Sequence, residues 1–397
     1  MPAEPPVESK RKVGRGELAP GCPAHVGADG VWKVQDFAGA RSVLRSTETR
    51  QAGFAMERAA RFEGRMRLAV LYRDGPEHRE HRRQTARYFT PTRVDTAYRK
   101  FMERLAEQQC DVLRQRGAAD LSQLSFRLAV AVAAEVVGLT ESGAGMARRL
   151  DRFFAESGGT PGWRNPRATY RQLRSSLNLA LFYWRDVRPA IAERKPERRD
   201  DLISHLLSEG CNKAEVLGEC VTVAAAGMVT TREFISVAAW HLFSDDALRL
   251  AYVEGTEKER VAILHEILRL EPVVANLYRR TTADVRVGGS TIPAGALVDI
   301  GVAASNMDPE AVGADPGSVR PARPLADGVG DAGLSFGDGP HRCPGAYIAI
   351  QETDIFLTKL FALPGLAMVR EPTVRLRPEI SSYELVGMRV RVSCQPS

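Results

Sequence analysis

The stretch that decides the fold is Phe336-Gly337-Asp338-Gly339-Pro340-His341-Arg342-Cys343-Pro344-Gly345. It places one cysteine in a loop with three glycines and two prolines, and the sequence that follows has helical character. Glycine permits positive-φ turns and allows a backbone to approach a ligand closely. Backbone N–H groups in such a loop can point at the sulfur, which favours the thiolate, the form of cysteine that binds metals. A structural cysteine buried in a glycine-rich loop is the alternative interpretation.

This segment resembles the heme-ligand signature of the cytochrome P450 family, which reads Phe, Gly, x, Gly, x, His or Arg, x, Cys, x, Gly. Every restricted position matches, and the resemblance extends from about residue 30 to residue 392. It implies that Cys343 is the metal ligand, as the axial thiolate of heme b (iron protoporphyrin IX). It also implies that Phe336, Gly337 and Gly345 shape the cofactor-binding loop. An axial thiolate pushes electron density onto iron and favours O–O cleavage.

The composition is that of an ordinary soluble globular protein, with 397 residues, 44% hydrophobic and 26% charged. The first 20 residues are polar and lack the apolar core of a signal peptide, and no uncharged apolar run of membrane-spanning length stands out. We therefore expect a disordered lead-in at 1–20, a single domain at 21–397, a cytoplasmic location and no contact with membranes. The six cysteines lack paired metal spacing, so reduced thiols are expected.

The net charge of +6 and the pI near 9.1 raise the question of an acidic partner. The arginines are spread along the chain without a nucleic-acid-binding motif, so no nucleic acid partner is expected. The resemblance instead favours a ferredoxin, supplied by a ferredoxin reductase, that docks near Arg83, Arg87 and Arg342. A merely solvated basic surface is the alternative.

Helical periodicity dominates the first two-thirds of the chain. In 99–113 the apolar residues Phe101, Leu105 and Val112 form a stripe, flanked by a second set at 102, 106, 110 and 113. Asn212, with Glu215 three residues later, predicts a capped helix of roughly 45 Å that ends near Phe243. The apolar middle of this helix, 221–229, predicts burial.

The last third has a different character. Residues 284–295 predict a short hairpin, 309–338 an irregular stretch, and 388–392 an edge strand. The chain is therefore expected to be mainly α with small β-sheets. The resemblance implies the cytochrome P450 fold, a helix-rich triangular prism that holds heme between the long central helix and the cysteine loop.

Two buried heme propionates would require positive partners. His78 and Arg82 are four residues apart, so they share a helix face. They resemble the His-x-x-x-Arg pair of the family, and Arg279 and His341 match two further propionate partners. Taken singly, each of the four is more often a surface charge, and it is the four together, in the order of the family, that indicate a propionate site.

Glu266 and Arg269 lie three residues apart on a predicted helix, a spacing that places them on one face. The resemblance implies that they join Arg323 in a structural triad that holds the loop around the heme ligand. The usual meaning of an isolated Glu-x-x-Arg is a pair on a helix surface.

The middle of the long helix carries the candidate catalytic residues Ala226, Gly227 and Thr230. A mid-helix glycine weakens the helix, and a threonine can bond back to a carbonyl and bend it. In the family this opens a groove for dioxygen, and the matching Thr230 steadies the activated oxygen and its water. A buried threonine that is satisfied by its own backbone is the alternative.

The residue before Thr230 departs from the family pattern, because Val229 stands where an Asp or Glu is usual. A carboxylate there relays protons, which is typically worth about 10²–10⁴-fold in rate, and valine cannot do so. The substrate could relay protons itself, Glu233 could substitute through water, or the reaction could dispense with the second protonation.

By the same resemblance the substrate walls fall roughly at 50–71, 153–184, 273–278 and 381–385. The second wall contains an aromatic cluster that could bind a flat or cyclic substrate, and core packing explains the cluster equally well. Its members are Trp163, Tyr170, Phe182, Tyr183 and Trp184. Arg61, Arg65 and Arg67 could meet a carboxylate, or they could be solvated.

The resulting hypothesis is a cytoplasmic heme-thiolate monooxygenase, an iron-dependent oxidoreductase that oxidises a small organic molecule with O₂ and electrons from a ferredoxin. A role in secondary-metabolite biosynthesis suits the departure at Val229. The alternatives are oxidative coupling or nitration, peroxide-driven turnover, and a non-catalytic heme sensor. The substrate, the site of attack, the native redox partner and the oligomeric state stay open.

Overall fold

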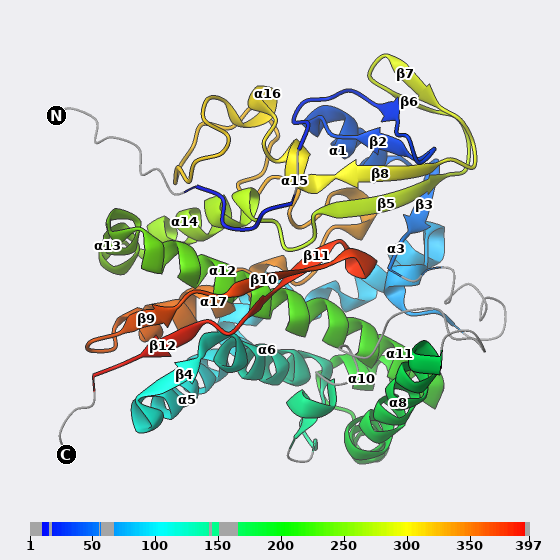
Figure 1. Cartoon of the computed structure of the whole chain (residues 1–397). Helices are drawn as coiled ribbons and strands as arrows, with labels where there is room; N and C mark the ends of the chain where they lie inside the picture. Colours follow the sequence, from blue (N-terminus) through cyan, green and yellow to red (C-terminus); the bar gives the residue numbers. More distant parts are fainter. Residues whose placement is uncertain are drawn as a thin grey trace.

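A computed structural model describes residues 10–15, 18–54, 56, 67–142, 145–150 and 166–393. Helices dominate it and the small sheets lie at several separate places, so the chain is mainly α with small β-sheets, as expected (Figure 1). The α-helices are α1 (Phe37–Arg45), α3 (Gly75–Thr85), α4 (Pro91–Arg93), α5 (Arg99–Arg116), α6 (Leu121–Val137), α8 (Pro166–Phe182), α9 (Arg188–Arg194), α10 (Leu202–Ser208), α11 (Lys213–Ala224), α12 (Thr230–Ser244), α13 (Asp246–Glu254), α14 (Glu257–Leu270), α15 (Val302–Ser305), α16 (Pro309–Val312) and α17 (Ala346–Phe361).

Short helical segments of other kinds join these helices. Those of 3₁₀ type are η2 (Val70–Tyr72), η3 (Ala86–Tyr88), η7 (Gly339–His341) and η8 (Pro378–Ile380). Those of π type are η4 (Val94–Tyr98), η5 (Tyr183–Val187) and η6 (Ala225–Val229).

The strands form four small sheets. A five-stranded sheet has the order β1 (His25–Val26), β2 (Trp32–Val34), β8 (Leu297–Gly301), β5 (Asn276–Thr281) and β3 (Thr49–Ala52). Its β2–β8 pair is parallel and the others are antiparallel. The predicted hairpin forms from β6 (Val285–Val287) and β7 (Ser290–Ile292). The remaining sheets pair β10 (Thr373–Arg377) with β11 (Ser382–Val386), and order β4 (Ala118–Asp120), β12 (Arg389–Arg391) and β9 (Ala367–Arg370).

The position of β12 corrects one prediction. The alternation at 388–392 predicted an edge strand, but β12 lies between β4 and β9 and pairs with both. Its exposed arginines reflect the open faces of a small sheet, since Arg389 and Arg391 are exposed while Val390 is fully buried.

The long helix forms as predicted and begins with a complete capping box. Asn212 accepts from the backbone of Glu215, and the Glu215 side chain accepts from the backbone of Asn212. The helix then runs through α11, η6 and α12 to Ser244. Within the described residues this is the one helix long and apolar enough to cross a membrane by length and composition. However, 61% of its most apolar window is buried, and it crosses the middle of the protein as a core helix (Figure 1).

Burial along this helix differs from the prediction. The segment 221–229 was expected to be buried, yet only Ala224 and Met228 are, and Ala226 is exposed. The buried part is the following one, 231–242, which packs into the main core. Residues 221–229 are therefore mostly only partly buried, whereas α12 lies inside the core.

Helix α5 presents a different face from the expected one. The predicted central stripe of Phe101, Leu105 and Val112 is only partly buried. The residues beside it are fully buried, namely Met102, Ala106, Cys110 and Leu113. This face meets α6 and α17 in the largest apolar cluster.

The N-terminal residues also depart from the prediction of a disordered lead-in. Val13 is fully buried, and its N–H and that of Lys12 donate to the Glu271 carboxylate. Lys10 forms a β-bridge with Ser318. Residues 1–9, 16 and 17 lie outside the described part of the chain.

Candidate functional site

The cysteine loop has the tight turns that its glycines predicted. Gly337 and Gly339 have φ of 67° and 66°. A Cβ on Gly339 would lie 2.4 Å from the Leu44 carbonyl oxygen, so no other residue fits there. The Cys343 N–H closes the loop by donating to the Phe336 carbonyl at 2.8 Å. Gly345 differs from the expectation of a positive φ, because its φ is −84° and it precedes the first residue of α17.

Two opposing effects act on the Cys343 thiol. Its side chain keeps accessible surface, although protein surrounds the sulfur closely enough for burial to raise the pKa of the thiol. The Gly345 N–H and the charges of Arg82 and Arg342 lower that pKa, but burial outweighs them. The loop therefore directs a donor at the sulfur, as the sequence predicted, without favouring the thiolate by itself.

The two predicted histidines of the propionate set lie in direct contact. His78 on α3 stacks on His341 of the loop, with ring centroids 4.1 Å apart and planes 14° from parallel. The His341 Nε2 lies 2.9 Å from Asp74 Oδ1. Burial, with the nearby His341 and Arg82, lowers the pKa of His78 to about 4, so this imidazole is neutral near pH 7.

The two predicted arginines border the same region. Arg279 on β5 is 3% exposed, and its guanidinium donates to the Gln51 side chain and the Tyr278 carbonyl, which are both neutral. Among the described residues no carboxylate lies within ion-pair distance of it, and burial lowers its pKa to about 10. Arg82 donates to the Arg342 carbonyl beside Cys343.

A buried arginine with only neutral partners fits an anionic group. The cluster of Arg279, Arg82 and the two stacked histidines, next to a cysteine loop, therefore suits a porphyrin that carries carboxylates. Sequence reasoning missed Asp74 and Gln51, which hold His341 and Arg279 in place. Only the pairing of β3 with β5 brings Gln51 opposite Arg279, and no local pattern signals this.

The helix widens at the predicted groove. Residues Ala225–Val229 form the π-helical turn η6, and the Thr230 hydroxyl donates back to the Ala226 carbonyl. π-helical turns occur often at functional sites. Gly227 points elsewhere, since a Cβ there would lie 3.6 Å from the Ala133 Cβ on α6. That is an ordinary van der Waals distance, so packing on α6 does not itself require glycine here, whereas Ala226 and Thr230 keep exposed surface.

Glu233 does not lie where a relay to Thr230 would need it. It is fully buried, with one oxygen accepting from Arg232 at 2.6 Å and the other from the Leu385 N–H at 2.8 Å. Burial raises its pKa to about 7. The carboxylate thus joins α12 to β11, which argues against the relay that the sequence suggested.

The predicted triad forms in full. Glu266 on α14 accepts from Arg269 at 2.7 and 2.8 Å and from Arg323 Nε at 2.8 Å. Arg269 also donates to the carbonyls of Asn306 and Pro316, which fixes the irregular stretch before the cysteine loop. All three side chains are buried, so the triad is internal and not a pair on a helix surface.

Helix α17, which follows the loop, buries an unpaired acid. Glu352 is 2% exposed, its Oε1 has no hydrogen-bond partner in the described structure, and burial raises its pKa to about 8. The native state therefore keeps a proton that the unfolded chain releases at its ordinary pKa of 4.5.

Stability should consequently fall as the pH rises from about 4.5 to 8 and level off above that, since the native state binds the extra proton in this range. Glu352→Gln should flatten this dependence and raise the free energy of unfolding at pH 8 by roughly 3 kcal/mol. Urea unfolding between pH 5 and 9 measures both. Glu80→Gln on the exposed face of α3 is the control, and an unchanged pH slope in Glu352→Gln would contradict the assignment.

The basic residues expected at a redox partner surface are exposed. Arg83 and Arg87 lie at the end of α3 and in η3, and Arg342 lies in the cysteine loop. Arg83 pairs with Glu80 on its own helix at 2.6 Å, which offsets part of its charge.

The aromatic wall does not form as expected. Tyr170 and Trp184 are 59% and 57% exposed on the outside of α8 and η5, while Phe182 is buried in a core cluster. Trp163, Arg61 and Arg65 lie outside the described residues. Tyr183 packs edge-on against Trp184 at 5.7 Å.

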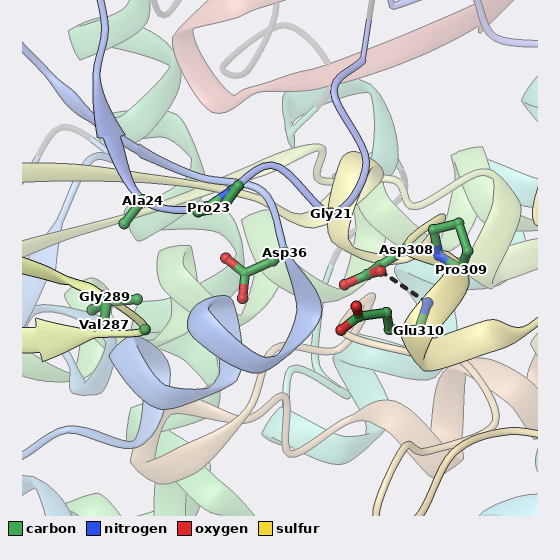
Figure 2. Close-up of a pocket in the computed structure, with 10 residues that line it drawn as sticks. Gly21, Pro23, Ala24, Asp36, Val287, Gly289, Asp308, Pro309 and Glu310 are labelled. Atoms are coloured by element: carbon green, nitrogen blue, oxygen red, sulfur yellow. Dashed lines mark hydrogen bonds between the residues drawn. The ribbon is translucent and has the colours of Figure 1, made fainter.

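A pocket of about 540 Å³ lies elsewhere, where the N-terminal segment meets the hairpin and α16 (Figure 2). Its acidic side chains cap local backbone. Asp36 accepts from the Gly39 N–H, and Asp308 accepts from the N–H groups of Phe37 and Glu310. No predicted site residue lines this pocket, so it is not the candidate site.

Comparisons with known proteins agree on one family. The family model described as Cytochrome P450 matches residues 261–363. The chain is 28% identical over 368 residues to erythromycin C-12 hydroxylase of Saccharopolyspora erythraea, covering 88% of this chain and 85% of that protein. It is 28% identical to pentalenic acid synthase of Streptomyces avermitilis over 85% of this chain and 82% of the other. The crystal structure of CalO2 superimposes with a TM-score of 0.76 at 24% identity, covering 94% and 93% of the two chains.

Proposed function

This chain belongs to the cytochrome P450 family, and from that premise we propose that it is a heme-thiolate monooxygenase of bacterial secondary metabolism that oxidises a small organic molecule. The observation that carries the proposal is the meeting of the Cys343 loop with the cationic cluster of Arg82 and Arg279. A cofactor with one metal and carboxylate groups suits this region, because the metal can bind the cysteine and the carboxylates can bind the arginines.

In this proposal Cys343 holds the iron of heme b, and Gly345 supplies an N–H to the sulfur. Arg82, Arg279, His78 and His341 bind the propionates, because they lie together beside the loop. Phe336 accepts the N–H of Cys343, and Gly337 permits the turn that aims it. When bound, heme supplies dioxygen activation and oxidation of the substrate.

Thr230 controls the proton in this proposal. Its hydroxyl donates to the Ala226 carbonyl within the widened turn, and it can rotate to donate to a neighbouring water or substrate instead. Val229 cannot transfer a proton, and Glu233 is held by Arg232 and Leu385. The proton source is therefore a water or a polar group of the substrate itself.

Thr230→Ala should release several-fold more hydrogen peroxide per substrate oxidised, because the hydroxyl that positions the proton is lost. Peroxide and product are measured together for the same consumption of reductant. Thr222→Ala is the matched control, since the Thr222 hydroxyl makes the same bond to a carbonyl four residues earlier on this helix, at 2.9 Å. Equal coupling in the two variants would remove Thr230 from the proton path.

Electrons reach the protein from a ferredoxin and its reductase in this proposal, and Arg83, Arg87 and Arg342 form the docking surface. The location is cytoplasmic, as for an enzyme that depends on such soluble partners. Both statements rest on the family and on the exposed basic residues near the cysteine loop.

The test of the function is a spectral titration of the ferric protein against cyclic dipeptides, polyketides, terpenes and aromatic acids. A saturable shift of the Soret band identifies a ligand beside the iron, and turnover with ferredoxin, reductase and O₂ should then yield an oxygenated product. Product formed only with hydrogen peroxide would favour peroxide-driven turnover. A coupled product without added oxygen would replace the monooxygenase assignment, and binding without any product would favour a sensor.

A further inference from the structure

Arg73 is a buried cation whose hydrogen-bonding capacity is largely unused. Its side chain is 8% exposed, and its Nε and Nη1 have no partner among the described residues. Its remaining nitrogen reaches Glu219 Oε1 at 3.4 Å, a long contact for a buried ion pair. Buried polar groups are nearly always satisfied, so two free N–H groups on one buried guanidinium require an explanation.

The surroundings of Arg73 are rich in donors and poor in acceptors. Glu219 already accepts from the Val70 N–H at 2.8 Å and lies 3.6 Å from His81 Nε2. Arg67 reaches into the same cluster and donates to the Cys211 sulfur at 3.6 Å. A third buried nitrogen without a partner in the described structure, His205 Nε2, belongs to a side chain near His81 and Tyr88.

The charges in this cluster also do not cancel. Burial raises the pKa of Glu219 to about 7, so this carboxylate is only partly ionised near neutral pH. Burial, with the charges of Arg73, Arg67 and His205, lowers the pKa of His81 to about 3. The further acids nearby are Glu77, which is exposed, and Glu215, which is partly buried and engaged in the cap of α11. Arg73 is therefore buried beside a single carboxylate, Glu219, whose ionisation burial opposes.

Glu219 of this cluster lies on the same long helix as the widened turn. Glu219 stands seven residues before Ala226 on the same helix, which is close to two full turns, so both project from the same side. The rise between them is roughly 10 Å. The segment that carries Arg73 follows η2, which packs against both α11 and α3.

We propose that Arg73 binds a carboxylate of the substrate, about two helical turns from the Ala226–Thr230 groove. The unpartnered Nε and Nη1 lie on different edges of the guanidinium, so each can donate a single charge-assisted hydrogen bond to an anionic oxygen. This rests on the proposed function and narrows the substrate to organic acids long enough to reach from Arg73 to the Ala226–Thr230 groove, a span on the order of 10 Å from the helical rise between Glu219 and Ala226. A substrate of this length would bind Arg73 with its carboxylate and present its other end to the Ala226–Thr230 groove.

The test compares carboxylic acids with their methyl esters, because the two differ in charge and little in shape. Linear and aromatic acids of increasing length, each with its ester, are titrated into the ferric holoprotein by absorbance and by calorimetry. The acid of the best-fitting length should bind at least about tenfold more tightly than its ester. Arg73→Gln should remove this preference, Arg73→Lys should retain part of it, and Arg249→Gln at an exposed ion pair should leave it intact.

Several outcomes would overturn the carboxylate site. If acids and esters bind the original protein equally well, the carboxylate site is rejected. This comparison needs no variant, so it remains decisive even if Arg73→Gln fails to fold. An equal loss of acid and ester in Arg73→Gln would make the residue structural only. Inorganic phosphate that binds through Arg73 while no acid is preferred would assign the cluster to a free anion.

The calorimetric arm separates this inference from the proposed function. Acid preference that depends on Arg73 in a protein without a thiolate-type CO band would support the site and reject the monooxygenase. A normal CO band without any acid preference would do the opposite.

Discussion

Cys343→Ala is expected to abolish the thiolate-type CO spectrum of the reduced protein and to reduce product formation below detection. The effect is large because the other described cysteines lie outside the loop. Cys110, Cys211 and Cys220 are buried, and burial raises the pKa of each of their thiols, while Cys22 lies in the N-terminal segment beside His25. Alanine leaves the loop intact, since the bond from residue 343 to the Phe336 carbonyl is made by backbone. Absorbance of the reduced, CO-treated protein measures the result.

Cys22→Ala is the control for this change, because Cys22 is partly exposed and lies in the N-terminal segment next to His25. It should leave the CO spectrum unaltered. A thiolate-type band that survives in Cys343→Ala would reject the ligand assignment and with it the central premise of the proposed function.

Glu266→Gln should lower the free energy of unfolding by about 3–5 kcal/mol, the usual result of breaking a buried ion pair. The amide would leave Arg269 and Arg323 buried next to each other without the carboxylate they share. The segment before the cysteine loop would lose its anchor at the same time, so cofactor retention should fall together with stability. Urea unfolding and the ratio of heme to protein after gel filtration measure the two effects.

Glu80→Gln provides a control with the same three-residue spacing, since Glu80 pairs with Arg83 on α3. Both residues of that pair are exposed, and exposed pairs contribute little, so no measurable change is expected. A loss in Glu266→Gln no greater than in Glu80→Gln would mean that the triad does not hold the loop.

Much of this architecture could be predicted because its signals are local. The Asn212–Glu215 cap, the hairpin around Gly288 and the Glu266–Arg269 spacing each lie within a few residues, and all three form as expected. The glycine turns at 337 and 339 belong to the same class, because a positive φ is a property of single residues.

The predictions that failed depend on contacts that are distant in sequence. Helical periodicity located α5 correctly, but two adjacent apolar stripes compete there and only packing on α6 and α17 selects the one with Met102. Glu233 is one turn from Thr230 in sequence, and only the hydrogen bond from the Leu385 N–H shows that its carboxylate faces the strand β11. Arg73 and Glu219 are 146 residues apart and gave no signal at all.

The sheet formed by β4, β12 and β9 constrains when this protein can finish folding during its synthesis. The Ser122 hydroxyl donates to the Leu385 carbonyl, and residues 118–120 pair with 389–391. The helix that begins at Leu121 is therefore synthesised about 270 residues before β12, the strand that pairs with the residues just ahead of it. Until that strand emerges, the start of this helix and the Glu233 carboxylate lack their final partners, so a nascent chain stalled before residue 385 should remain a substrate for chaperones and proteases.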